Sequence, residues 1–496
     1  MKEIIYIQAG SISNYVGTHF WNAQETYFTY EEGDDPYVNH DVSFREGQTL
    51  KGEPTFCPRL LLFDRKSNFG ALGRGMYGEE ESENAVLSQW NGAVDELRQP
   101  AVPKSKYQTC LESGDDVSQE DSKDIRYWSD YSHVSYHPRT PQRLPDVADY
   151  ENTEGDWELS RDAFTKYNES TDLMEDAFRF FVEECDNIQG LQIMNDTSTF
   201  GGFTHSFLSA FRDEFTKLPS WTFSFLSDSI PVSLNVDDPR SIMKALNDAL
   251  CLQGLNGLST MTIPFYSPLL WEKGSWLSEI DLKDSLFQSA SIISTHVETI
   301  TLPLRLKNSQ HTMTNLSSAL TTRGNQRIGH LAGTFPVQEN VRDLETKLYD
   351  LTLNTSKLSK PDQCSGCVDV SRGFSEPLKL KHSDWRGGWR QGAIIVESPA
   401  ILPPTSFPRY FKSGTTPSSL SALTTLTTTS RTASLFGQYA KLADNCTKQY
   451  AHVIQQMGLE MDDVKELRDT LHVLEDEYRG DETNSDDEDE LGEDEE

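Results

Sequence analysis

The sequence predicts an α/β fold in which parallel strands alternate with helices. A short apolar segment, a run of small polar residues and then a helical apolar pattern occur near the N-terminus and recur near residue 190. A further apolar strand is expected at residues 222–226. Strands that alternate with helices usually pair in parallel and are covered on both faces. The 496 residues leave room for a second α/β domain behind this sheet.

The first of these units starts the chain. Residues 4–7 form an apolar strand, Gly10 follows it, and Ser11 and Asn14 precede an apolar-periodic stretch. This order places backbone N–H groups at a helix N-terminus, where they and the helix dipole favour phosphate. An ordinary strand-to-helix turn would give the same pattern, so both interpretations stay open at this point.

A second strand is expected at residues 59–64, where it ends in Asp64. An acid at the carboxyl end of a strand in an open α/β sheet often lies near the ligand crevice. The acidic, glycine-rich residues 31–55 before this strand are expected to form a loop. Three prolines followed by acids make residues 136–157 a plausible linker.

The recurrence near residue 190 begins with the clearest helical pattern of the N-terminal half. Its apolar stripe consists of Met174, Phe178, Phe181, Cys185 and Ile188. Gly190 is expected to cap this helix, and residues 191–194 to form a strand. Residues 196–202 are expected to form a small-residue loop that leads into a helix over 203–215.

The C-terminal half has a more mixed pattern. Residues 297–306 are strand-like, residues 308–342 resemble loops and short helices, and residues 401–434 are expected to form a loop with an exposed strand. The last helix carries an apolar stripe from Val464 to Tyr478, which suits packing on the body or on a partner helix. From residue 481 to 496 eleven of sixteen residues are acidic, which predicts a disordered tail.

Composition and charge exclude several classes of function. The net charge of −34 repels nucleic acid and anionic lipid, so direct nucleic-acid binding is not expected and basic protein surfaces are the natural partners. No apolar run is long enough for a transmembrane helix, and the N-terminus lacks the features of a targeting signal.

The cysteines give no sign of a disulfide framework. Seven dispersed cysteines indicate reduced thiols. Cys364 and Cys367 form a CxxC without a second ligand pair, so no metal site is expected.

Several segments resemble the tubulins. Residues 1–21 align without a gap with the start of tubulins, and residues 174–196 resemble the tubulin helix and strand before the glycine-rich phosphate loop. LPLRL at 302–306 and TTRGNQ at 321–326 resemble pieces of the tubulin C-terminal half. The phrase FREGQTL followed by PR, within residues 42–64, resembles the Misato family of divergent tubulin-like proteins.

This resemblance implies a tubulin-like fold: a nucleotide-binding-type parallel sheet, a second α/β domain and C-terminal helices. The implied organisation is a Misato-like N-terminal segment, a linker, a tubulin-like central domain, a C-terminal region with terminal helices, and the acidic tail. The corresponding ranges are 1–125, 126–157, 158–345, 346–480 and 481–496.

The resemblance also carries over a set of nucleotide-contacting positions. They are Gly10, Ser11, Asn14, Asp64, Gly201 and Gly202. Where tubulins have a nearly continuous glycine loop, this chain has only two glycines, and Asp196 would bring a negative charge close to phosphate. Phe200 adds a side chain where glycine permits close approach. Lys66 replaces another acid of the tubulin pattern.

The tubulin pattern further includes a catalytic acid supplied to the neighbouring subunit from a helix before residues 302–306. An ungapped count places Ser291 there, whereas an insertion would bring Glu279, Asp281 or Glu298 into that role.

No cofactor is therefore expected, with GTP binding left open. The resemblance to the Misato family implies a non-enzymatic factor in mitochondrial distribution, morphology and inheritance. This factor would be located at the cytoplasmic face of the mitochondrion and in the cytoplasm. Cytoskeletal or mitochondrial-surface proteins would be its partners. The alternative is a GTP-binding, filament-forming GTPase.

Overall fold

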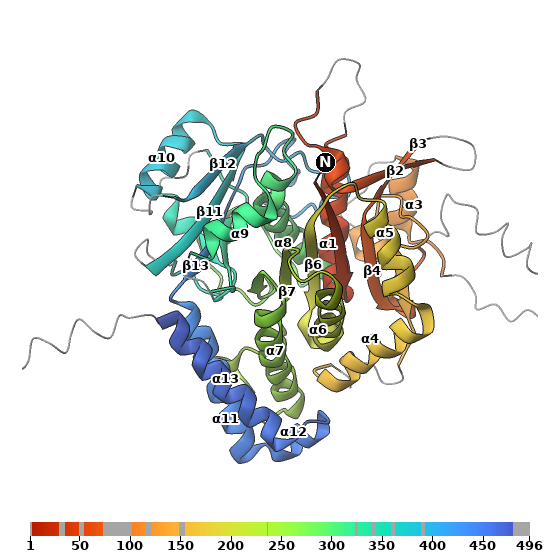
Figure 1. Cartoon of the computed structure of the whole chain (residues 1–496). Helices are drawn as coiled ribbons and strands as arrows, with labels where there is room; N and C mark the ends of the chain where they lie inside the picture. The colour runs from red at the N-terminus through yellow and green to blue at the C-terminus, as the bar shows by residue number, and fades with distance from the viewer. Residues whose placement is uncertain are drawn as a thin grey trace, which may run out of the picture.

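A computed structural model describes most of the chain. The described residues are 2–28, 35–48, 54–72, 102–114, 121–147, 154–235, 237–322, 326–339, 341, 343–358, 363–387 and 392–479. They form two main sheets, a short hairpin and a set of surrounding helices (Figure 1). The acidic tail lies outside the described residues. Within them, no helix combines the length and the apolar character needed to cross a bilayer.

The N-terminal sheet has six strands in the order β5-β4-β1-β6-β7-β8, and every neighbouring pair is parallel. Its strands are β1 (Glu3–Ala9), β4 (Leu60–Arg65), β5 (Pro141–Leu144), β6 (Ile188–Asp196), β7 (Ser220–Phe225) and β8 (Met261–Phe265). Every residue of β1 and β4 is buried, as expected of strands covered on both faces. The predicted parallel α/β sheet is confirmed.

Helices cover both faces of this sheet. Around it lie α1 (Ser11–Glu25), α3 (Lys106–Ser113), α4 (Trp157–Thr171), α5 (Arg179–Glu183), α6 (Thr197–Glu214) and α7 (Pro239–Leu258). The phenylalanines of α6 pack with α4 and the odd-numbered side chains of β1 in one apolar core. The even-numbered side chains of β1 belong to a second, larger core together with Phe20 and Trp21 of α1.

The second sheet is mixed and has the order β10-β9-β13-β11-β12. Its strands are β9 (His330–Thr334), β10 (Tyr349–Asp350), β11 (Cys364–Arg372), β12 (Ile394–Ser398) and β13 (Ala422–Thr429), and α9 (Met313–Leu320) and α10 (Glu376–Arg386) lie beside it. Helix α8 (Leu286–Thr301) contacts α1 of the first unit and also β11 and β13. It therefore joins the two units, and its residues from Phe287 onward are all buried.

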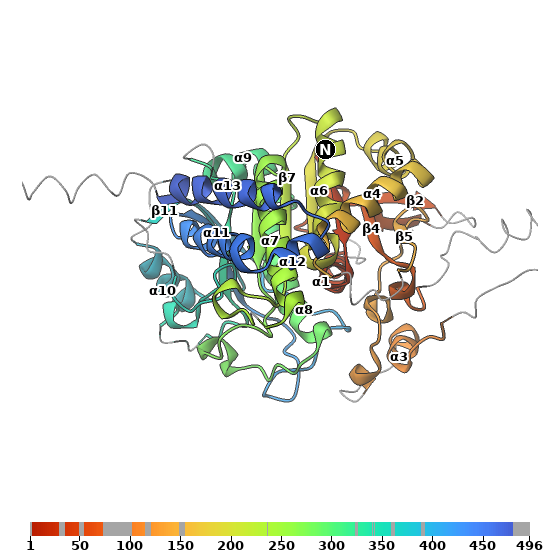
Figure 2. The same ribbon diagram turned by 90° about the horizontal axis from the view of Figure 1, so that it is seen from below.

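The chain closes with α11 (Thr432–Gln449), α12 (Ala451–Gln456) and α13 (Met461–Arg479). Helices α11 and α13 pack on each other and on α7 (Figure 2). The predicted apolar stripe of α13 is entirely buried, and the amide of Ile328 donates to the Tyr478 hydroxyl at 2.8 Å. Of the two expected arrangements, the structure has the one in which this helix packs on the body.

The segment before β6 differs from the predicted single helix. It forms a π-helical turn (Met174–Phe178) followed by the short α5, and Ile188 already belongs to β6. Gly190 therefore lies inside the strand and caps no helix; a side chain there would collide with the Pro219 carbonyl. The helical spacing of Ile188 is a coincidence, because its backbone pairs with Glu3 of β1.

Four other expectations are wrong, the last of them in part. Residues 297–306 form the end of α8 and a 3-10 turn (Leu302–Leu304), because burial between the two units outweighs the strand propensity of the β-branched residues. The strand within 401–434 is β13, which is buried in the middle of its sheet.

The other two corrections concern the N-terminal half. Residues 31–55 were expected to be a loop, but they contribute β2 (Phe44–Gln48) and the start of β3 (Pro54–Pro58), which form a hairpin. Part of the expected linker at 136–157 forms the edge strand β5.

Candidate functional site

The carboxyl ends of β1, β4 and β6 meet at the N-terminus of α1. The predicted strand–turn–helix is present: β1 ends at Ala9, Gly10 has a φ of 105°, and α1 begins at Ser11. The amide of Asn14 donates to the Gly10 carbonyl at 3.0 Å and so closes the first helical turn. The amides of the first turn have no partner within the helix and are available to an anion.

Asp196, the last residue of β6, supplies that anion. Its carboxylate accepts hydrogen bonds from the amides of Ile12 and Ser13, both at 2.8 Å, and from the Ser13 hydroxyl at 2.6 Å. Burial raises the pKa of Asp196 to about 7, and the hydrogen bonds from Ser13 and Ile12 act against this rise. A Cβ at Gly10 would lie 2.4 Å from Asp196 Oδ2, so glycine is needed here for both space and backbone conformation.

Asp64 lies at the end of β4, as expected, and is fully buried. Asn14 donates to its Oδ2 at 3.0 Å, while the Arg65 amide and the Asn68 side chain donate to its Oδ1 at 2.8 Å. Burial raises the pKa of Asp64. The predicted Asn14 and Asp64 are thus brought together, but they bind each other and other protein groups. Ser11 is partly exposed beside them, and Lys66 is exposed just beyond β4.

The region expected to be a phosphate loop is not a loop. Thr197 directly follows β6 and starts α6, and its hydroxyl bonds with Asp248 of α7. Ser227 also donates to Asp248, at 2.7 Å, and Asn247 donates to the Thr197 carbonyl at 2.6 Å. Sequence reasoning missed Asn247, Asp248 and Ser227. The available signal was the Asn–Asp pair interrupting the apolar sequence of α7.

The two predicted glycines lie within α6, where they permit close helix packing. A Cβ at Gly202 would lie 2.5 Å from the Trp157 carbonyl of α4. A Cβ at Gly201 would meet Cys251 of α7 at 3.4 Å. Phe200 is buried in the core beneath this helix. These positions therefore serve the α4–α6–α7 packing in this structure.

The residues considered for the catalytic acid are dispersed. Ser291 is buried in α8, where its hydroxyl donates to the Gln288 carbonyl at 2.7 Å and to the Tyr410 hydroxyl at 3.1 Å. Glu298 is buried on the same helix between Arg305 and Arg372. Glu279 lines a cavity elsewhere in the molecule. Among the described residues, no group of three or more His, Cys, Asp or Glu side chains is arranged to hold a metal ion.

Comparison with known proteins gives the family. The Misato Segment II tubulin-like domain matches residues 2–113, and the tubulin domain matches residues 117–306. Protein dml-1 of Neurospora crassa is 32% identical over 68% of this chain and 63% of its own length. Protein DML1 of Gibberella zeae is 33% identical over 67% of each chain.

Protein dml1 of Aspergillus clavatus is 30% identical over 76% of this chain and 77% of its own length. The match spans less than two thirds of the Neurospora crassa protein but two thirds or more of the other two relatives. The two domains and the three relatives point to one group of proteins. The chain therefore belongs to the Misato/DML1 family of tubulin-like proteins.

Proposed function

We propose that this protein is a non-enzymatic tubulin-like factor that acts in mitochondrial distribution, morphology and partitioning of the organelle and its DNA. Family membership supports the tubulin-like part of this proposal. The observation that carries the non-enzymatic part is the position of Asp196, whose carboxylate lies on the first-turn amides of α1. In nucleotide-binding α/β proteins those amides receive phosphate.

A phosphate group could reach these amides only by displacing Asp196. The displaced carboxylate would lose three hydrogen bonds and would stay beside a second anion of higher charge. Movement of β6 would be needed to separate them, because Asp196 is the last residue of a strand that is paired along its length with β1 and β7. Both electrostatics and packing therefore act against nucleotide binding.

The start of α6 offers no replacement for the lost site. A phosphate loop needs a flexible backbone whose amides can close on the ligand, whereas Thr197 here is fixed by Asp248 and Asn247. Phosphoryl transfer depends on positioning and electrostatic stabilisation by such groups. We infer that the tubulin-like fold serves as a scaffold for other proteins.

Charge and family support the proposed partners and location. A chain with a net charge of −34 is suited to basic protein surfaces and is repelled by anionic lipid, so recruitment to the cytoplasmic face of the mitochondrion would proceed through proteins. Cytoskeletal and mitochondrial-surface proteins are the proposed partners, and proximity labelling in cells tests this. Labelling confined to proteins of other compartments would contradict the proposed location.

Nucleotide analysis separates this proposal from the alternative, a GTP-binding protein that forms filaments. The protein is purified, denatured by heat, and the released nucleotides are quantified by chromatography. We expect no guanine nucleotide. Near-stoichiometric guanine nucleotide in the wild-type protein would favour the alternative, and its loss in an Asp64→Ala variant would assign it to this site.

A further inference from the structure

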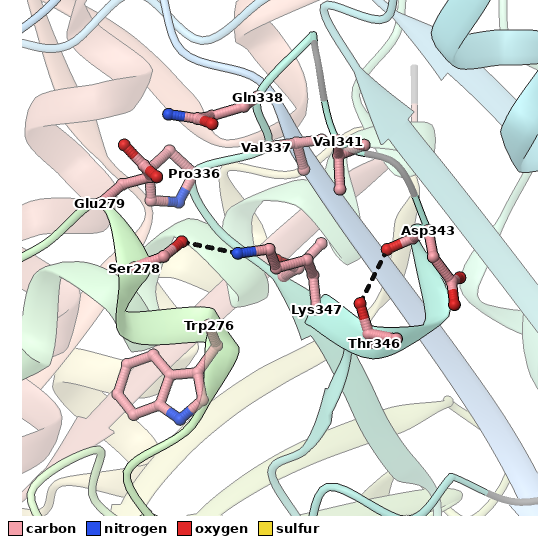
Figure 3. Close-up of a pocket in the computed structure, with 11 residues that line it drawn as sticks. Trp276, Ser278, Glu279, Pro336, Val337, Gln338, Val341, Asp343, Thr346 and Lys347 are labelled. Atoms are coloured by element: carbon pink, nitrogen blue, oxygen red, sulfur yellow. Dashed lines mark hydrogen bonds between the residues drawn. The ribbon is translucent and has the colours of Figure 1, made fainter.

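A cavity of about 320 Å³ opens between the turn at 275–279 and a wall formed by residues within 334–338, 341 and 343–347. It shares no residue with the Asp196 site. Trp276, Pro336, Val337 and Val341 give it apolar walls, and Gln338, Glu279 and Asp343 also line it, with Glu279 and Asp343 on opposite sides (Figure 3). Its volume lies in the range of protein sites that hold a small ligand or one large side chain.

Hydrogen bonds fix the cavity in its open form. The Lys347 ammonium donates to the Ser275 carbonyl at 2.9 Å and to the Ser278 hydroxyl at 2.7 Å, which ties the two walls together (Figure 3). The Ser275 hydroxyl also donates to the Thr346 carbonyl. Because these bonds join the turn to the opposite wall across the cavity, a ligand would enter a preformed site.

The two ammonium groups beside the cavity already form hydrogen bonds to the turn, whereas one carboxylate beside it forms none with the described residues. Lys412 donates to the carbonyls of Leu277 and Ser278 at 2.9 and 3.0 Å, so it too is bound to the turn. The half-buried Glu279 carboxylate has neither a hydrogen bond nor an ion pair within the described part of the chain. The Asp343 carboxylate accepts one bond, from the Glu345 amide at 3.0 Å.

We propose that this cavity binds a basic side chain, arginine or lysine, of a partner protein. The aliphatic stem would lie against Trp276, Val337 and Val341, and the charged head would pair with Glu279. An apolar ligand would leave the Glu279 carboxylate without a partner. An anionic ligand would meet this carboxylate, while the Lys347 and Lys412 ammonium groups already donate to the turn. The net charge of −34 attracts a basic partner to this surface from a distance.

Ligand-observed NMR on the full-length protein tests this assignment. The probe is a capped tripeptide with a central arginine, and the matched probe carries citrulline, which has the same shape without the charge. We expect the arginine peptide to bind at least about tenfold more tightly than the citrulline peptide, as a charged hydrogen-bonded pair would give. Glu279→Gln should abolish this preference, and added salt should weaken it.

Glu345→Gln is the control, because this exposed acid lies on the neighbouring turn but does not line the cavity. It should leave peptide binding unchanged, and both variants should keep the melting temperature of the wild-type protein. Equal binding of the two peptides, or absence of binding, would overturn the proposal. Tighter binding of spermidine than of the arginine peptide would overturn the assignment to a protein side chain.

Discussion

Two buried carboxylates, Asp196 and Glu298, show two ways of accommodating a negative charge inside this protein. Asp196 rests on the backbone amides of Ile12 and Ser13 at the start of α1. Glu298 lies on α8 and forms ion pairs with two fully buried guanidinium groups, those of Arg305 and Arg372. The first carboxylate therefore meets only partial charges, whereas the second meets two full positive charges.

The two carboxylates have different roles in the fold. Asp196 accepts from the amides of the N-terminal unit at which, under the proposed function, no ligand anion binds. Glu298 joins three elements: it accepts from Tyr27, just beyond α1, at 2.7 Å, and it pairs with Arg305 after α8 and with Arg372 of β11. We infer that Glu298 holds the two units in register and that Asp196 determines what the first unit can bind.

The largest expected effect is on the Glu298 cluster. Glu298→Gln keeps the shape of the side chain but leaves two buried guanidinium groups without a counter-charge. We expect the free energy of unfolding to fall by about 3–5 kcal/mol, measured by urea denaturation. The exposed Glu345→Gln should change it by less than about 0.5 kcal/mol. A loss for Glu298→Gln as small as that of the control would show that the cluster does not hold the units together.

A buried apolar contact gives a scale for this effect. Leu471 of α13 is fully buried, and its replacement by alanine should cost about 2–5 kcal/mol in urea denaturation. Val473, two residues away, is 57% exposed, so Val473→Ala is the matched control and should be nearly neutral. Equal losses in the two variants would mean that the α13 stripe is not packed on the body in solution.

Much of this architecture could be predicted from the sequence, because it rests on local patterns. The β1–Gly10–α1 unit, Asp64 at the end of β4 and the α13 stripe each follow from the spacing of apolar and small residues. The α8 segment at 297–301 could not be predicted this way, because its β-branched residues favour strand and only its burial between the units makes it helical.

The candidate site was partly predictable. The sequence placed Asp196 near the phosphate position, but it could not show that α6 starts at Thr197 or that Asp248, fifty-one residues later, fixes that start. It likewise could not show that the turn at 275–279 lies against residues 334–338, 341 and 343–347 to form the cavity. Contacts between residues distant in sequence decide both features.

The pH dependence of stability reports on buried acids, of which Asp196 is one. Its pKa rises from an ordinary value of 3.8 to about 7 on folding, so its protonated form is favoured in the folded state. The resulting stability is complete below pH 3.8 and is lost as the pH rises through 7. Asp248 has the same shift and the same sign.

Asp196→Asn should therefore make the free energy of unfolding less dependent on pH. Measured in urea between pH 5.5 and 8, the decline seen in the wild-type protein below pH 7 should lessen by up to about 1.4 kcal/mol per pH unit. The Asp248 contribution would remain. An unchanged slope would mean that Asp196 is not a buried titrating group.

The acidic tail should have the smallest effect on folding. Removal of residues 481–496 takes away eleven acids, and the last helix ends before them, at Arg479. We expect the melting temperature of the truncated protein to equal that of the full chain within error, or to rise slightly as charge repulsion falls. A large decrease on truncation would show that the tail contributes to the folded body.

GTP turnover, measured over a range of protein concentrations, shows whether the Asp196 site can support catalysis. If Asp196 occupies the phosphate position and α6 provides no phosphate loop, turnover should stay near background at every concentration, since losses of about 10² or more per missing group accumulate. The contradicting result is turnover that rises with protein concentration and disappears in the Asp64→Ala variant.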